Sequence, residues 1–252
     1  MKNKKLQQVC QEISNKNSDI LSTILIGSRA RGDFKENSDY DIMIVTRRGK
    51  NYQLELKYKK VISEKSNIDY FLLSVHLWPS KKFKEQYKKG TSFVYCALRD
   101  KKILSTKQNL FKLKLPNCQI AGKERLNWAE KMLKRLKRYL KFSYGKNEKI
   151  ISGFEIEELG YCAMHLCWAI CMLHNFCPLS KYTILRESKK YFIKKEFKTI
   201  KRTYKFYSNQ EIMRKINKKT FNNFYRGLSL IIKRLKQTNE TSPQQAIGYQ
   251  KK

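Results

Sequence analysis

A glycine–serine turn precedes a pair of aspartates near the start of the chain. Gly27-Ser28 is followed, eleven residues after the serine, by Asp39, and Asp41 comes two residues later. Glycine permits a tight turn and lets the backbone approach a phosphate, while Ser28 adds a hydroxyl and a backbone N–H. Aspartates two apart on a strand point to one face, and Mg²⁺ is commonly held by one or two carboxylates together with substrate phosphates. The run predicts a phosphate-binding turn beside a metal site.

Three further residues complete the candidate site. Asp69, near the start of a later predicted strand, can supply a third carboxylate or accept the proton of an attacking hydroxyl. Three carboxylates suit two Mg²⁺ ions, which stabilise the attacking and leaving oxygens together. Arg29 and Arg31 are candidate phosphate ligands because a guanidinium donates hydrogen bonds in a fork. Acid chemistry belongs to the first half of the chain, since none of the six aspartates lies beyond residue 100.

Short apolar segments must position these residues. Period-two and helical spacings of apolar side chains predict a small α/β (α+β) domain over residues 1–115, with a short mixed sheet. Residues 51–65 fit either a helix or a strand. The strand candidates are 22–27, 39–46, 67–74 and a short piece at 102–105, and the helix candidates are 1–18, 80–89 and 92–99.

The second half of the chain reads as helical throughout. Turn-forming residues at 115–122 predict the domain boundary, and an all-α bundle is expected over 123–236. The tail, 237–252, is polar and is predicted to be disordered. The expected helices are a lysine-rich one over 126–140, a buried apolar one over 154–175, and two more over 181–206 and 210–236.

The composition is strongly basic. The 252 residues include 55 Lys and Arg against 21 Asp and Glu, which gives a formal net charge of +34. A field of this sign attracts polyanions such as nucleotides or RNA in a salt-dependent way. The alternative interpretation is a solvated basic surface that only keeps the protein soluble, so RNA is a candidate partner and no more.

The chain is expected to be a cytoplasmic protein. It has seven cysteines and no visible signal peptide, which favours reduced thiols. No run of about 18 apolar residues is present, and the longest candidate, 161–173, is judged too short to span a bilayer. No membrane association is therefore predicted, and a homodimer is left open.

The motif resembles a known signature. Gly27-Ser28-Arg29-Ala30-Arg31-Gly32 with Ser38-Asp39-Tyr40-Asp41 is similar to the signature of the DNA polymerase β-like nucleotidyltransferase superfamily, and in its short form to the minimal nucleotidyltransferases. Asp69 matches the third acid of that pattern, and the resemblance covers about residues 20–105. It implies transfer of a nucleoside monophosphate, usually AMP from ATP, to an acceptor hydroxyl, with pyrophosphate released.

The helical half resembles, through its architecture, the HEPN-type bundles that accompany such domains, including those of antibiotic nucleotidyltransferases. HEPN ribonucleases carry Arg-x(4–6)-His, and none of the three histidines here has an arginine at that spacing. The bundle is therefore expected to shape a substrate site. A glutamate of the helical domain acts as general base in some antibiotic-modifying relatives. Glu155, Glu157 and Glu158 are the candidates, although helix capping is the favoured interpretation.

Several acceptors and one rival class stay open. Within the enzyme class, an antibiotic-like small molecule competes with a protein side chain, and the positive charge disfavours a cationic aminoglycoside. The rival is a nucleic-acid-binding module, or an RNA-terminal nucleotidyltransferase, in a toxin–antitoxin or defence system.

Two other patterns are interpreted as packing. Tyr and Phe alternate with Lys over 182–207, which fits an RNA-stacking surface but is explained more simply by helix packing. The cysteines and histidines over 162–177 are read as core residues and not as zinc ligands.

Overall fold

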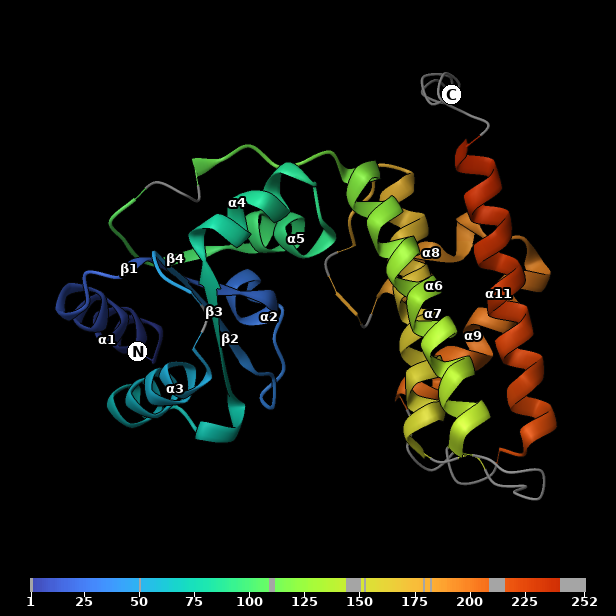
Figure 1. The fold of residues 1–252 in the computed structure, drawn as a ribbon, viewed down its shortest axis with the longest axis horizontal. Helices are drawn as coiled ribbons and strands as arrows, with labels where there is room; N and C mark the ends of the chain where they lie inside the picture. The colour runs from blue at the N-terminus through green and yellow to red at the C-terminus, as the bar shows by residue number, and fades with distance from the viewer. Residues whose placement is uncertain are drawn as a thin grey trace. The chain divides into compact units, whose positions relative to one another are not determined.

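The chain forms two compact units, Met1–Asn117 and Cys118–Lys252 (Figure 1). The computed structural model describes residues 2–49, 51–108, 112–143, 151, 153–178, 180–181, 183–208 and 216–240. Each unit is considered by itself.

The first unit is built on a four-stranded mixed sheet in the order β3-β2-β1-β4. β1 pairs antiparallel with both β2 and β4, while β2 pairs in parallel with β3. This confirms the predicted mixed sheet. The strands are β1 (Ile20–Ile26), β2 (Tyr40–Thr46), β3 (Leu73–Pro79) and β4 (Lys102–Thr106).

Helices cover both faces of this sheet. The ambiguous segment 51–65 is a helix, because the Asn51 side chain caps its first turn by accepting from the Leu54 N–H. Asn67 ends that helix in the left-handed conformation, with φ of 54°. The elements are α1 (Lys2–Lys16), α2 (Gly27–Arg31), α3 (Tyr52–Ser66), the 3₁₀ turn η1 (Tyr70–Leu72), α4 (Ser80–Lys88) and α5 (Ser92–Asp100).

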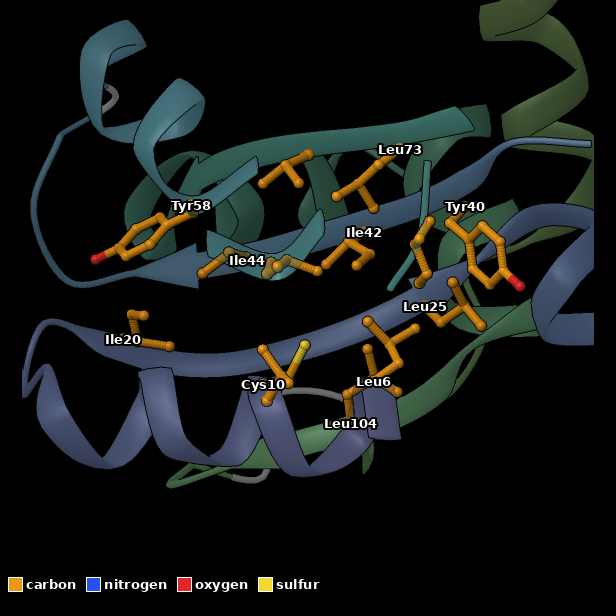
Figure 2. Packing of buried hydrophobic residues seen from close by; sticks show 14 of the residues in the cluster. Leu6, Cys10, Ile20, Leu25, Tyr40, Ile42, Ile44, Tyr58, Leu73 and Leu104 are labelled. Carbon is orange, nitrogen blue, oxygen red and sulfur yellow. The ribbon is translucent and has the colours of Figure 1, made fainter. Parts of the chain in front are cut away.

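Strand β2 contributes to two hydrophobic cores. Ile42 and Ile44 point into a cluster with residues of α1 and α3, which Figure 2 shows at close range. Met43 and Val45 point the other way, into a cluster with residues of α4 and α5. Because successive strand residues alternate between faces, a strand covered on both sides is apolar along its length. Both cores fix the position of the strand that carries Asp41.

The third strand corrects the sequence prediction. It was expected over 67–74, but β3 begins at Leu73 and runs to Pro79. Asn67 and Asp69 are the reason: the first stops α3 and the second caps η1. Short polar side chains that bond to nearby backbone compete with the strand ladder. Asp69 therefore lies four residues ahead of the strand and not on it.

The second unit is helical, as predicted. The central helix α7 is apolar all round and is packed by α6, α9, α8 and α11. Glycine allows its closest contact, since a Cβ on Gly160 would lie 2.5 Å from the backbone nitrogen of Tyr207. The elements are α6 (Cys118–Ser143), α7 (Gly153–Leu173), α8 (Ile184–Ser188), η3 (Lys189–Tyr191), α9 (Lys194–Ser208) and α11 (Lys218–Glu240).

Several boundaries in this unit differ from the prediction. Helix α6 begins at Cys118, inside the stretch read as a boundary turn. The segment 181–206 is broken into α8, η3 and α9 instead of one helix. Helix α11 continues to Glu240, so residues 237–240 are helical, and the rest of the predicted tail lies outside the described residues.

Helix α7 bears on the question of a membrane crossing. Among the described residues it is the single helix whose length and composition would allow one. Within the structure 72% of that apolar window is buried. The helix serves as the core of the bundle.

The cysteine and aromatic patterns are packing features. Cys162, Cys167 and Cys171 are buried on α7, and none of the seven cysteines, all within the described residues, forms a disulfide. Burial raises the pKa of the Cys167 thiol to about 12, which keeps it protonated and inert. On α9, Tyr204 and Phe206 are buried and face inward, which supports the packing interpretation over an RNA-stacking surface.

Candidate active site

The glycine–serine turn and the Asp-x-Asp pair meet at Gly27. This residue starts α2 directly after β1, with φ of +71°, where glycine alone is unstrained. A Cβ built on Gly27 would lie 2.9 Å from Oδ2 of Asp41. The Asp41 carboxylate therefore occupies the space that a side chain at position 27 would fill. Two features that the sequence placed fourteen positions apart (27 and 41) are in direct contact.

The sheet register positions the two aspartates. Asp41 is the second residue of β2, half-buried, and pairs with Ile26 of β1 on one side and Ser74 of β3 on the other. Asp39 comes just before the strand and is exposed. Their hard carboxylate oxygens, beside the turn at Gly27, fit a Mg²⁺ ion that also takes substrate phosphates.

Asp69 is not brought to this pair. Its Oδ1 accepts the Phe71 N–H at 2.8 Å, which caps η1. The β3 residue beside Asp41 is instead Ser74. Asp69 lines a hollow of about 530 Å³ whose wall includes Tyr40, and Tyr40 faces away from Asp41 on the strand. No three His, Cys, Asp or Glu side chains gather to hold a metal in the part of the chain that is described.

Arg29 holds the loop that leads to the aspartates. Its guanidinium carbon lies 4.2 Å from the ring centroid of Phe34 and 4.4 Å from that of Tyr40. Its Nε donates to the Ser38 carbonyl at 3.1 Å, and its Nη2 donates to the Glu36 carbonyl at 2.8 Å. Stacking on both rings combined with a two-point fork is geometry that lysine cannot reproduce. We call this arrangement the Arg29 clamp.

Arg31 also has protein partners. Its Nη1 donates to Oδ2 of Asp100 at 2.5 Å, and its Nε donates to Oδ1 of Asp33 at 3.1 Å. The Asp100 side chain is nearly buried and also bonds to Arg99. Arg31 thus ties α2 to the end of α5. The phosphate-binding roles expected for Arg29 and Arg31 stay predictions, and the structure gives each arginine a structural task.

Two of the three candidate glutamates, Glu155 and Glu158, are held within the second unit. Oε2 of Glu158 accepts from Nη2 of Arg135 at 2.5 Å, and Glu155 is buried in the first turn of α7. Two residues of the first unit escaped the sequence reading. Ser74 was missed because the strand register was shifted, and Tyr40 was read only as the spacer of the Asp-x-Asp motif although it forms half of the Arg29 clamp.

Comparison with known proteins agrees with this geometry. Residues 4–98 match the family described as "Nucleotidyltransferase domain". The first unit therefore contains a nucleotidyltransferase domain. No curated protein matches the sequence.

A solved structure shares the fold of both units. The spectinomycin adenyltransferase AAD(9) from Enterococcus faecialis, solved with ATP and spectinomycin, superposes with a TM-score of 0.50 at 13% identity. The match covers 90% of this chain and 98% of that one. At this identity the likeness is one of fold: an α+β nucleotidyltransferase domain followed by helices.

Proposed function

We propose that the chain is a Mg²⁺-dependent enzyme that moves AMP from ATP onto a hydroxyl of an antibiotic-like small molecule and releases pyrophosphate. The contact between Gly27 and Asp41 is the observation that carries this proposal. It joins a phosphate-binding turn to a metal-binding carboxylate within a matched nucleotidyltransferase domain. Adenylyl transfer needs those two elements side by side.

The residues divide the work as follows. The backbone at Gly27 and the Ser28 hydroxyl hold the phosphates that leave, while Asp39 and Asp41 hold the metal. When bound, Mg²⁺ neutralises charge on the phosphate oxygens. The acceptor oxygen forms a bond to the α-phosphorus, the bond from that phosphorus to the pyrophosphate oxygen breaks, and the hydroxyl proton is released. Positioning and charge stabilisation supply most of the acceleration.

The choice of acceptor has two supports. The structural neighbour was solved with ATP and spectinomycin, a small molecule, and the match covers 98% of that chain. The net charge of +34 disfavours a polycationic acceptor. We therefore propose a neutral, hydroxyl-bearing molecule, with a protein hydroxyl as the alternative within the same chemistry.

A second candidate, addition of nucleotides to an RNA end, is favoured by charge alone. Residues 118–252 carry 30 basic and 10 acidic side chains, against 25 and 11 in residues 1–117. A polyanionic acceptor would gain from this field in proportion to the phosphates neutralised.

Incubation with nucleoside triphosphates labelled at the α-phosphate tests these alternatives. The acceptors are separate pools of hydroxyl-bearing antibiotics, protein and RNA, each with Mg²⁺. We expect label on one antibiotic and equal release of pyrophosphate, both absent in the Asp39→Ala/Asp41→Ala double variant. Label on RNA, falling steeply as salt rises, would favour the second candidate. Equal pyrophosphate release by wild type and the double variant contradicts the enzyme proposal.

A further inference from the structure

Four side chains from two packed helices converge in the second unit. Arg125 and Trp128 lie three residues apart on α6, and His165 and Trp168 lie three residues apart on α7. Residues at this spacing share one face of a helix. We call the four residues the α6–α7 cluster.

The contacts run across the helix pair. The guanidinium carbon of Arg125 lies 4.8 Å from the ring centroid of Trp168. The rings of Trp128 and His165 have centroids 3.9 Å apart at an angle of 46°. Trp128 keeps 40% of its surface exposed, whereas Trp168 keeps 9%. The cluster thus has one buried indole, that of Trp168, and one indole that solvent reaches, that of Trp128.

Two polar atoms of the cluster have no partner. Nε of Arg125 and Nδ1 of His165 are buried without a hydrogen bond to any described residue. Buried polar groups are nearly always paired, and an unpaired one is costly. The exposed Trp128 packs directly on His165, so a turn of that indole would open His165 to a bound molecule. The cost is removed when a ligand pairs with both atoms.

The chemistry of the cluster selects its ligand. Arg125 is cationic, and none of the four side chains is acidic, so a cation is repelled. Burial, with Arg125 nearby, lowers the pKa of His165 well below its usual value and keeps the imidazole neutral. An exposed indole offers a stacking surface to a planar ring. A planar, polar ring without positive charge meets all of these conditions.

We propose that the α6–α7 cluster binds a nucleobase, which stacks on Trp128 and hydrogen-bonds to Arg125 and His165. The base comes from a free nucleotide or from an RNA end, and the basic composition of the unit favours either phosphate-bearing source. The α6–α7 cluster lies in the second unit, whereas Asp39 and Asp41 belong to the first. It does not rest on the proposed transferase activity.

Calorimetric titration of the Asp39→Ala/Asp41→Ala chain in EDTA isolates the site, because the catalytic site then lacks its metal ligands and metal. The probes are AMP, ribose 5-phosphate and a short single-stranded RNA. We expect AMP to bind and ribose 5-phosphate to fail, because it lacks the base. Trp128→Ala and Arg125→Ala should each weaken binding about tenfold. Tyr139→Ala and Arg138→Ala, exposed on the same helix, are the matched controls and should leave it unchanged.

The three probes distinguish a free nucleotide from an RNA end as the source of the base. They also show whether the cluster binds a base at all. RNA that binds no tighter than AMP indicates a free nucleotide, and RNA that binds more tightly indicates an RNA end. Trp128→Phe keeps an aromatic ring and should retain part of the affinity, which guards against a folding defect in Trp128→Ala. The proposal is overturned if no base-bearing probe binds, if ribose 5-phosphate binds as well as AMP, or if the control variants lose as much affinity as the cluster variants.

Discussion

The residues that frame Asp39 and Asp41 and the residues of the α6–α7 cluster use polar side chains in opposite ways. In the first unit, Arg29, Arg31 and Asp100 are paired, and their bonds fix the loop and the helix that frame the aspartates. In the second unit, α7 packs through apolar surface and glycine contacts, while a buried atom of Arg125 and one of His165 find no hydrogen-bond partner among the described residues. Hydrogen bonds and ion pairs position the residues around the two aspartates. Steric fit positions the helices that pack closely on α7. Four sets of variants test this contrast.

The largest effect is expected at Gly27. In Gly27→Ala the new methyl group competes with the Asp41 carboxylate at 2.9 Å and strains a positive φ, so transfer should fall about 100-fold. Gly32→Ala is the matched control, because Gly32 has φ of +90° but no atom of the described residues within 4 Å of its Cβ position. Pyrophosphate release measures both variants. Equal losses would show that backbone strain matters and the contact does not.

The helical counterpart is Gly160. A methyl group there would lie 2.5 Å from the Tyr207 nitrogen, and overpacking of this kind costs about 1–3 kcal/mol. Gly153→Ala, on the same helix and with no described atom within 4 Å of its Cβ position, should have little effect. Urea unfolding curves followed by circular dichroism give the midpoints. A Gly160→Ala midpoint equal to that of Gly153→Ala would contradict packing through glycine.

The Arg29 clamp predicts a change in metal dependence. Arg29→Lys keeps the charge but loses the fork and the stacking, so the loop that carries Asp39 shifts. The Mg²⁺ concentration for half-maximal activity should rise about fivefold to tenfold, with kcat at saturating Mg²⁺ nearly unchanged. Arg48→Lys, at a side chain 89% exposed, is the control. A rise in KM for the nucleotide at fixed, saturating Mg²⁺ would instead favour the phosphate-binding role.

The smallest effect is expected at Glu130, which Lys236 and Lys134 contact. The hydrogen bond from Lys236 lowers the pKa of Glu130, so the pair stabilises the fold above the usual carboxyl pKa and loses that effect as pH falls through the lowered value. Glu130→Gln should cost about 0.5 kcal/mol at pH 7. Urea midpoints from pH 7 downward should converge with wild type in acid. A constant difference would point to packing instead of charge.

Features that depend on residues close together in the sequence could be predicted from it. The turn at Gly27 and the Asp-x-Asp strand follow from local chemistry and alternation, so the mixed sheet and the helical half were predicted correctly. Asp69 was misplaced because Asn67 and Asp69 end one element and cap another, which outweighs the strand propensity of the apolar residues that follow. The Arg29 clamp and the α6–α7 cluster could not be predicted. Both depend on which side chains the folded backbone brings face to face.

The burial of α7 has a consequence for synthesis of the protein. This apolar helix leaves the ribosome before α9 and α11, the later helices that pack on it. Until those residues emerge, the nascent chain displays a surface that resembles a membrane segment, with α6 as its earlier-made helical cover. Exposed apolar surface of this kind recruits chaperones or drives aggregation. A chain that stops before residue 194 should therefore be insoluble, although every proposed catalytic residue has already been made.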